Sequence, residues 1–271
     1  MDRTIAYYVG FFLKIFSATL FLPVAVGKIY GESFVQLESF IFAAFISIVL
    51  GYLLQAFGEP KKPDAIEGMI AATVGWVLAV AIGGIPFMLM LEFSFPAAFF
   101  EAMSAFSTTG MSQIKDIGSL PRSLLFWRVF AQWIGGLGIL TFFVTVVVEA
   151  GGAATALLSA EANKTDSGSI RPSLFTALKS LWYVYIVVTS LMAVILYGLG
   201  MSFFNAMLYA LATMPTGGLA STAGGIAAFH SWKIEAVVTV FMVAGGTNFL
   251  LLYRLIVGDV RSLLSLSAPI W

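Results

Sequence analysis

Two short polar loops interrupt an otherwise apolar sequence. The first reads SAFSTTGMSQI over residues 104–114, and the second reads TMPTGGLAS over residues 213–221. Each combines small polar side chains with glycine, which adopts positive φ without strain and so allows successive carbonyls to be aimed in one direction. Backbone carbonyls arranged in this way replace the hydration shell of a cation in potassium-channel filters. The loops therefore predict a cation filter, with the candidate ligand residues Thr108, Thr109, Gly110, Met111, Thr216, Gly217, Gly218 and Leu219.

The composition places these loops in a membrane. The chain has 271 residues, of which 60% are hydrophobic and 10% charged, whereas about 25% are charged in a typical soluble domain. It contains no cysteine and one histidine, His230, which excludes disulfides and argues against a metal cluster. The net charge of zero argues against nucleic acid as a partner. No nucleophilic, dinuclear or phosphate-cradling motif supports an enzyme, and no cofactor other than a potassium ion as substrate is expected.

Long apolar segments predict the helices that position the loops. A helix needs about 20 apolar residues to cross a bilayer, and stretches of about 12 are typical of re-entrant segments. Two such short stretches, residues 95–106 and 203–214, directly precede the two polar loops. Six segments are long enough to span: residues 5–28, 34–57, 66–91, 124–148, 174–199 and 232–255.

Lysine and arginine residues predict the orientation of the spans. Eight of them fall on the side of the N-terminus and four on the opposite side. Because cytoplasmic loops carry the excess of positive charge, both termini are expected in the cytoplasm and both polar loops in the outer half of the bilayer. The expected location is the plasma membrane, crossed several times.

An internal repeat relates the two loops. A shift of 108 positions places residues 94–110 on residues 202–218 without a gap, and six of the seventeen positions are identical, where chance gives about one or two. The glycine pairs at 135–136 and 245–246 match at a shift of 110. Each repeat reads as span, short helix, polar loop and span, so both have one orientation. Parallel repeats are related by an axis along the membrane normal, where a pore can lie.

Each short segment is predicted to be a half-helix that ends inside the membrane. Ser94 and Ser202 are candidate N-caps, and Pro96 falls near the first turn, where proline is tolerated. The C-terminal end of such a helix carries partial negative charge, which favours a cation at the loop. Non-helical backbone at this depth persists only where protein or a water-filled cavity surrounds it.

The predicted fold class is therefore an all-α integral membrane protein. Two leading transmembrane helices precede two parallel repeats, each of the form span, pore helix, filter loop and span. The expected domains are a leading hairpin at 1–60, a first pore repeat at 61–150, a cytoplasmic linker at 151–173, a second pore repeat at 174–258 and a cytoplasmic tail at 259–271.

Two ionisable residues fall within the membrane segments of the first repeat. Glu101 lies in the first half-helix and Arg128 in the following span. Intramembrane ionisable residues are by default functional or paired, so the two are expected to form a pair that supports the filter; the alternative is that each reaches water separately. The small residues of Gly135-Gly136-Leu137-Gly138 favour close helix packing over a hinge.

Four motifs resemble the TrkH/KtrB family of potassium transporters, within the Trk/Ktr/HKT superfamily. They read FFEAMSAFSTTGM, LLFWRVFAQWIGGLGIL, ALATMPTGGLAS and VFMVAGGTNFLLLYRLIVGD, and their order matches that of the family. The leading pair of helices resembles TrkH-type members. The resemblance implies potassium as substrate, filter glycines at Gly110 and Gly218, and a TrkA-like cytoplasmic nucleotide-binding ring as a regulatory partner.

The sequence departs from the family in the number of repeats. Family members have four, which surround a pseudo-fourfold, potassium-channel-like pore, and this sequence contains two, so the resemblance implies half of such a pore. We therefore expect a subunit that takes up potassium together with a second copy or a second-half polypeptide in the lipid bilayer. Two alternatives remain open at this stage: a non-conducting truncated or split-gene fragment, and an ordinary cation secondary transporter with a binding site at broken helices.

Overall fold

The computed structural model describes residues 2–150, 170–219 and 221–247. These residues form α-helices, connecting loops and one short 3₁₀-helix. Within them, four helical segments are long and apolar enough to cross a membrane: Arg3–Ile29, Phe34–Phe57, Ile66–Leu91 and Leu178–Gly198. The protein is thus an all-helical membrane protein with four candidate spans in the described part of the chain.

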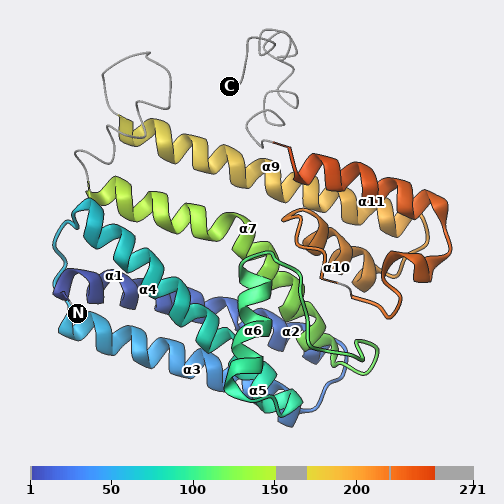
Figure 1. The fold of residues 1–271 in the computed structure, drawn as a ribbon, viewed down its shortest axis with the longest axis horizontal. Helices are drawn as coiled ribbons and strands as arrows, with labels where there is room; N and C mark the ends of the chain where they lie inside the picture. Colours follow the sequence, from blue (N-terminus) through green and yellow to red (C-terminus); the bar gives the residue numbers. More distant parts are fainter. Residues whose placement is uncertain (1, 151–169, 220, 248–271) are drawn as a thin grey trace, which may run out of the picture.

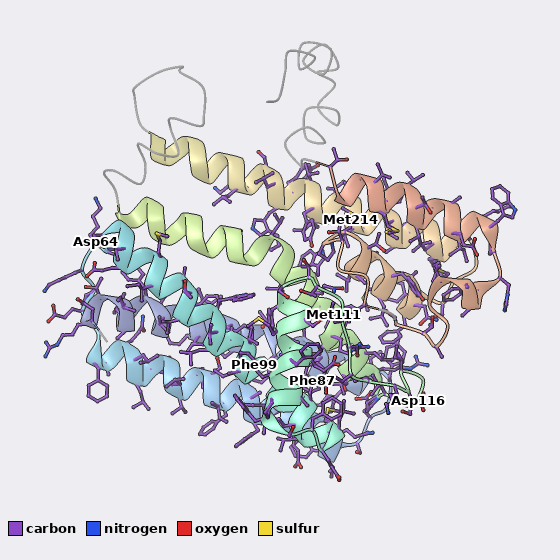
Figure 2. The ribbon with its side chains drawn as sticks, viewed as in Figure 1. Asp64, Phe87, Phe99, Met111, Asp116 and Met214 are labelled. Carbon is purple, nitrogen blue, oxygen red and sulfur yellow. The ribbon has the colours of Figure 1, made fainter. Side chains whose placement is uncertain are left out.

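The long helices lie side by side along the longest axis of the molecule (Figure 1). The short helix α6 (Phe95–Phe106) lies near the middle of this axis, and the short helix α10 (Phe203–Thr213) lies farther from the N-terminus. Asp64 and Asp116, labelled in Figure 2, mark the two opposite ends. The helices in chain order are α1 (Arg3–Thr19), α2 (Phe21–Ile29), α3 (Phe34–Phe57), α4 (Ala65–Gly83), α5 (Ile85–Leu91), α6 (Phe95–Phe106), α7 (Arg122–Ala150), α9 (Ile170–Gly198), α10 (Phe203–Thr213), the 3₁₀-helix η1 (Gly225–Phe229) and α11 (Trp232–Gly245).

Two predicted spans are interrupted by a break near a proline. The segment at 5–28 forms α1 and α2, which meet at Leu20, and the segment at 66–91 forms α4 and α5, which meet at Gly84. Pro23 and Pro86 follow these breaks, and a proline inside a helix removes one N–H and clashes with the carbonyl four residues earlier. Leu20 and Gly84 lie within the four residues that precede Pro23 and Pro86, so proline accounts for both breaks.

The other predicted segments agree with the helices where these are described. Residues 124–148 lie within α7, and 174–199 agrees with α9 to within four residues at the start and one at the end. The segment at 232–255 begins with α11, which ends at Gly245, and residues 248–255 lie outside the described part. Most of the expected linker at 151–173 and all of the expected tail at 259–271 also lie outside it.

The leading hairpin packs tightly through small residues. A Cβ added to Gly10 of α1 would lie 2.5 Å from the carbonyl oxygen of Gly51 on α3. The Ser47 hydroxyl donates a hydrogen bond of 2.8 Å to the Leu13 carbonyl, which joins the same two helices. Close backbone approach and a hydroxyl bond are the means by which helices associate in a membrane, where no hydrophobic effect drives them together.

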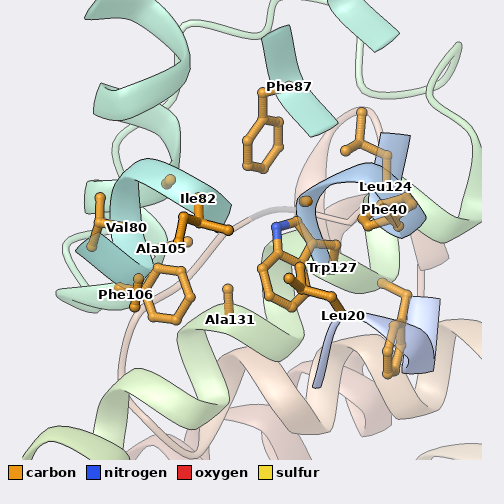
Figure 3. Packing of buried hydrophobic residues seen from close by; sticks show 14 of the residues in the cluster. Leu20, Phe40, Val80, Ile82, Phe87, Ala105, Phe106, Leu124, Trp127 and Ala131 are labelled. Atoms are coloured by element: carbon orange, nitrogen blue, oxygen red, sulfur yellow. The ribbon is translucent and has the colours of Figure 1, made fainter. Parts of the chain in front are cut away.

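The largest apolar cluster is built around Trp127 of α7 (Figure 3). Its side chain is fully buried, and its ring lies 6.0 Å from that of Phe106 and 6.2 Å from that of Phe40, measured between centroids. The indole N–H donates a hydrogen bond of 2.9 Å to the carbonyl of Gly83. That carbonyl lies at the α4–α5 break, so Trp127 fixes the leading hairpin, the first span of the repeat and the first half-helix to one another.

Candidate functional site

The two half-helices match the sequence prediction closely. Helix α6 has 12 residues and α10 has 11, and each is followed by an irregular loop. Ser202 caps α10 by accepting a hydrogen bond of 3.3 Å from the Asn205 N–H. Ser94 occupies the N-cap position of α6 but makes no such side-chain bond, and Pro96 lies in the first turn of that helix.

The loops after the half-helices have the same backbone conformation. In loop 1 (residues 107–111), φ is positive at Thr108 and Gly110, with values of 55° and 77°. In loop 2 (residues 214–219), φ is positive at Thr216 and Gly218, with values of 55° and 68°. Positive φ at a threonine is a rare, strained conformation, and it recurs here at positions that are 108 residues apart. The sequence repeat is therefore also a repeat in three dimensions.

The amide groups of both loops turn back toward their half-helices. The N–H groups of Thr109 and Gly110 donate to the Ser104 carbonyl at 3.0 and 3.4 Å. Those of Gly217 and Gly218 donate to the Ala212 carbonyl at 3.3 and 3.4 Å.

In the described part of the chain, the carbonyl oxygens of the loop residues 108–110 and 216–218 accept no hydrogen bond. Oxygen atoms that have no protein donor are suited to coordinate a cation, because hard cations prefer oxygen ligands.

The two loops are in direct contact. A Cβ added to Gly110 would lie 1.9 Å from the carbonyl oxygen of Gly217 and 3.1 Å from its carbonyl carbon. A Cβ added to Gly218, the equivalent glycine of loop 2, would have no neighbour within 4 Å among the residues that the structure describes. Loop 2 thus covers Gly110 of loop 1, whereas no described residue covers Gly218, the equivalent position of loop 2.

The second span of each repeat packs against the end of its half-helix through glycine. A Cβ added to Gly135 of α7 would lie 2.1 Å from the carbonyl oxygen of Phe106, the last residue of α6. A Cβ added to Gly245 of α11 would lie 2.7 Å from the carbonyl oxygen of Met214, just after α10. Gly136 likewise approaches Pro215 and the Tyr185 hydroxyl. The glycine motifs thus serve close packing at this site.

Loop 1 is held by a buried polar cluster of its own repeat. Glu101 and Arg128 have side chains that are each 1% exposed, and Arg128 Nε lies 3.9 Å from Glu101 Oε2. Ser112 connects them, because its hydroxyl lies 2.9 Å from Glu101 Oε1 and 3.0 Å from Arg128 Nη2. The N–H of Gln113 also donates to Glu101 Oε1. The Ser104 hydroxyl donates a hydrogen bond of 2.5 Å to the Met111 carbonyl.

Loop 2 is held from the neighbouring repeat by Gln132 of α7, a residue that sequence reasoning missed. Gln132 is fully buried, and its Oε1 accepts a hydrogen bond of 3.4 Å from the Leu219 N–H. A Cβ added to Gly217 would lie 2.1 Å from the Gln132 amide carbon. A polar side chain in the middle of a span was the signal that could have identified it.

The remaining predicted ligand residues differ in exposure. The Leu219 side chain is 3% exposed, whereas Met111, its equivalent in loop 1, is 62% exposed. Met111 lies beside α6 in Figure 2, in the half of the molecule that contains both loops. No group of three or more His, Asp or Glu residues that could hold a metal ion occurs among the described residues. The candidate ligands are the backbone oxygens of residues 108–110 and 216–218, which accept no hydrogen bond from the described residues.

Comparison with known proteins gives a consistent result. The family model described as "TrkH: Cation transport protein" matches residues 35–265. An uncharacterized cation transporter of Methanocaldococcus jannaschii is 31% identical over 94% of this chain and 52% of its own length. The Trk system potassium uptake protein TrkH of Escherichia coli K12 is 29% identical over 94% of this chain and 54% of its own length.

A solved structure shows the same arrangement of helices. The crystal structure of the potassium transporter TrkH from Vibrio parahaemolyticus superposes with a TM-score of 0.78 at 27% identity, covering 95% of this chain and 53% of that one. The chain spans about half the length of the curated relatives it matches. It belongs to the TrkH family of cation transport proteins.

Proposed function

We propose that this chain forms half of a potassium-selective uptake pore, in which the two loops supply backbone carbonyls to a filter. The observation that carries the proposal is the shared loop geometry: positive φ at equivalent positions, amides turned toward the half-helices, and carbonyls that accept no hydrogen bond from the described residues. Such a geometry suits a dehydrated cation. In this proposal the ligand residues are those from Thr108 to Met111 and from Thr216 to Leu219.

The proposed architecture consists of the leading hairpin and two parallel repeats, with six spans in all. The repeated contacts of Gly135 with Phe106 and of Gly245 with Met214 support one orientation for both repeats. In this arrangement both termini are cytoplasmic, as the excess of positive charge predicts, and the protein resides in the plasma membrane. A cytoplasmic nucleotide-binding ring that contacts residues 151–173 is the proposed regulatory partner.

Two further loops are needed to complete the filter, and the open edge of the second repeat supports this. In the described ranges, nothing covers the Cα of Gly218 as loop 2 covers that of Gly110. Met242, which is equivalent to the buried Gln132 at a shift of 110, is 56% exposed. A second copy or a second-half polypeptide placed at this edge would enclose the carbonyls on all sides, and carbonyls at membrane depth need such enclosure.

Cross-linking in membranes, followed by potassium flux into vesicles reconstituted with the purified assembly, tests this proposal. We expect a cross-linked dimer or a complex with a second polypeptide. We also expect potassium influx through this assembly to exceed sodium influx measured at the same concentration. Potassium flux through single, uncross-linked chains at high dilution in lipid would refute the need for a second half. Absence of cation flux from the cross-linked assembly would refute the filter.

A further inference from the structure

The two loops are stabilised in different ways, and this difference assigns a role to Gln132. At a shift of 108, Glu101 and Ser104 of α6 correspond to Tyr209 and Ala212 of α10. Arg128 of α7 corresponds at a shift of 110 to Val238 of α11. None of these three equivalents can form the carboxylate, hydroxyl and guanidinium cluster that holds loop 1. Tyr209 does link α10 to the segment after loop 2, because its hydroxyl lies 2.7 Å from that of Thr222. Ala212 and Val238, however, offer no counterpart to the contacts of Ser104 and Arg128, so part of the support of loop 2 must come from elsewhere.

Gln132 contacts loop 2 on both sides of its central glycine. Its amide packs against the Cα of Gly217, where a Cβ would lie 2.1 Å from both Cδ and Nε2. Its Oε1 binds the N–H of Leu219 at 3.4 Å. Gly217 and Leu219 flank Gly218, whose φ is 68°. Fixing the two flanking residues fixes the peptide planes on either side of Gly218, and these planes set the directions of the loop carbonyls.

The Gln132 side chain suits this positioning role. It is fully buried at the point where α7 of the first repeat faces the second loop. The same helix contacts loop 2 one turn further on, where Gly136 meets Pro215. In the buried interior a hydrogen bond is electrostatically stronger than in water, and an unpaired N–H at Leu219 would be costly.

We propose that Gln132 is the positioning residue through which the first repeat sets the carbonyl geometry, and hence the cation selectivity, of the second filter loop. This inference rests on the proposed function, because selectivity is a property of the filter. The proposed positioning role differs from simple space-filling, since filling the space beside Gly217 would require only a side chain of similar size. The hydrogen bond to Leu219 requires an acceptor.

Two substitutions test separately the hydrogen-bond acceptor and the volume of the Gln132 side chain. Gln132→Met keeps the length and most of the volume but removes the acceptor. Gln132→Glu keeps an acceptor oxygen and, because Nε2 has no hydrogen-bond partner among the described residues, loses no existing bond. Gln55→Leu is the control, since it removes an amide in the last turn of α3, where Gln55 packs beside Gly10 of α1 and not against either loop.

The first readout does not depend on transport. The chain has no cysteine, so Leu219→Cys or Met111→Cys introduces a single thiol whose rate of modification by a water-soluble reagent can be measured in membranes. We expect Gln132→Met to speed modification at position 219 by roughly fivefold, the factor that corresponds to one lost hydrogen bond, and to leave the rate at position 111 unchanged. Gln55→Leu should change neither rate. Equal rates at position 219 with Gln and Met at position 132 would overturn the positioning role.

The second readout is the ratio of potassium to sodium flux through the reconstituted assembly. We expect Gln132→Met to lower the ratio several-fold with a modest loss of melting temperature, because the Leu219 N–H loses its acceptor, and Gln132→Glu to restore most of the ratio. An unchanged ratio in Gln132→Met would overturn the inference even if the unchanged protein conducts. Absence of flux in the unchanged protein would instead refute the proposed function, and the thiol rates would still test the contact.

Discussion

Replacing Glu101 and Arg128 by glutamine, singly and together, tests whether the buried pair acts as a unit. Each side chain is 1% exposed, and the charged atoms Nε and Oε2 lie 3.9 Å apart. Two unit charges at that distance attract by about 4 kcal/mol at an effective dielectric constant of about 20. Removing one partner of a buried pair costs about 3–5 kcal/mol, because the other charge is left without compensation. Each single variant should therefore lose about 3 kcal/mol of stability.

The double variant should lose less than the sum of the two single losses. Neither of its amides leaves a buried charge uncompensated, so we expect a coupling energy of about 1–3 kcal/mol. The free energy of unfolding in detergent is measured for the unchanged protein, the two single variants and the double variant. The control pairs Arg128→Gln with Glu38→Gln, an exposed carboxylate on α3, and this pair should be additive within about 0.3–0.5 kcal/mol. If the Glu101 and Arg128 losses are also additive within that range, the two side chains do not stabilise each other.

Three further sets of substitutions test individual contacts of the fold. Gly110→Ala should lower the melting temperature more than Gly218→Ala, although φ is positive at both, because only the first Cβ meets a carbonyl oxygen, at 1.9 Å; equal losses would contradict the contact between the loops. Trp127→Phe should cost about 1–3 kcal/mol in detergent unfolding, since the buried Gly83 carbonyl loses its donor, and a neutral result would show that this bond does not stabilise the α4–α5 break. Glu32→Ala should cost about 1 kcal/mol and Glu32→Gln less, because the carboxylate accepts an N–H from the first turn of α7 at 3.0 Å; the same loss in both would argue against this cap.

Much of the architecture could be predicted from the sequence because the membrane restricts the choices. Apolar length separates spans from half-helices, and the predicted short segment at 95–106 coincides with α6. The internal repeat then predicts that the two loops have the same backbone conformation. The equal dihedral angles at Thr108 and Thr216 bear this out for the backbone.

The side chains that support the loops were harder to predict, because they depend on contacts between distant segments. Glu101 and Arg128 are recognisable in the sequence as charges within the membrane, but nothing in the sequence marks Ser112 as the residue that connects them. Gln132 contacts residues 85 and 87 positions away. An internal repeat suggests symmetric support for the two loops, and the different residues at equivalent positions show that the support is asymmetric.

Helix breaks were the other feature that the apolar pattern concealed. Hydropathy at 5–28 and 66–91 is continuous, so each reads as one span, and the broken helices still satisfy the length needed to cross the membrane. The positions of Pro23 and Pro86 carried the missing information, because proline interrupts the backbone hydrogen bonds without reducing hydropathy.

The most direct test of the potassium filter is the reversal potential of the cross-linked assembly in a planar bilayer with potassium on one side and sodium on the other. The unchanged protein should show a reversal potential close to that of potassium. Gly110→Ser should shift it toward that of sodium, because the added Cβ displaces the carbonyl of Gly217, and a non-glycine residue strains the backbone at a φ of 77°. A normal current with an unchanged reversal potential in Gly110→Ser would contradict the assignment of these loops as the selectivity filter.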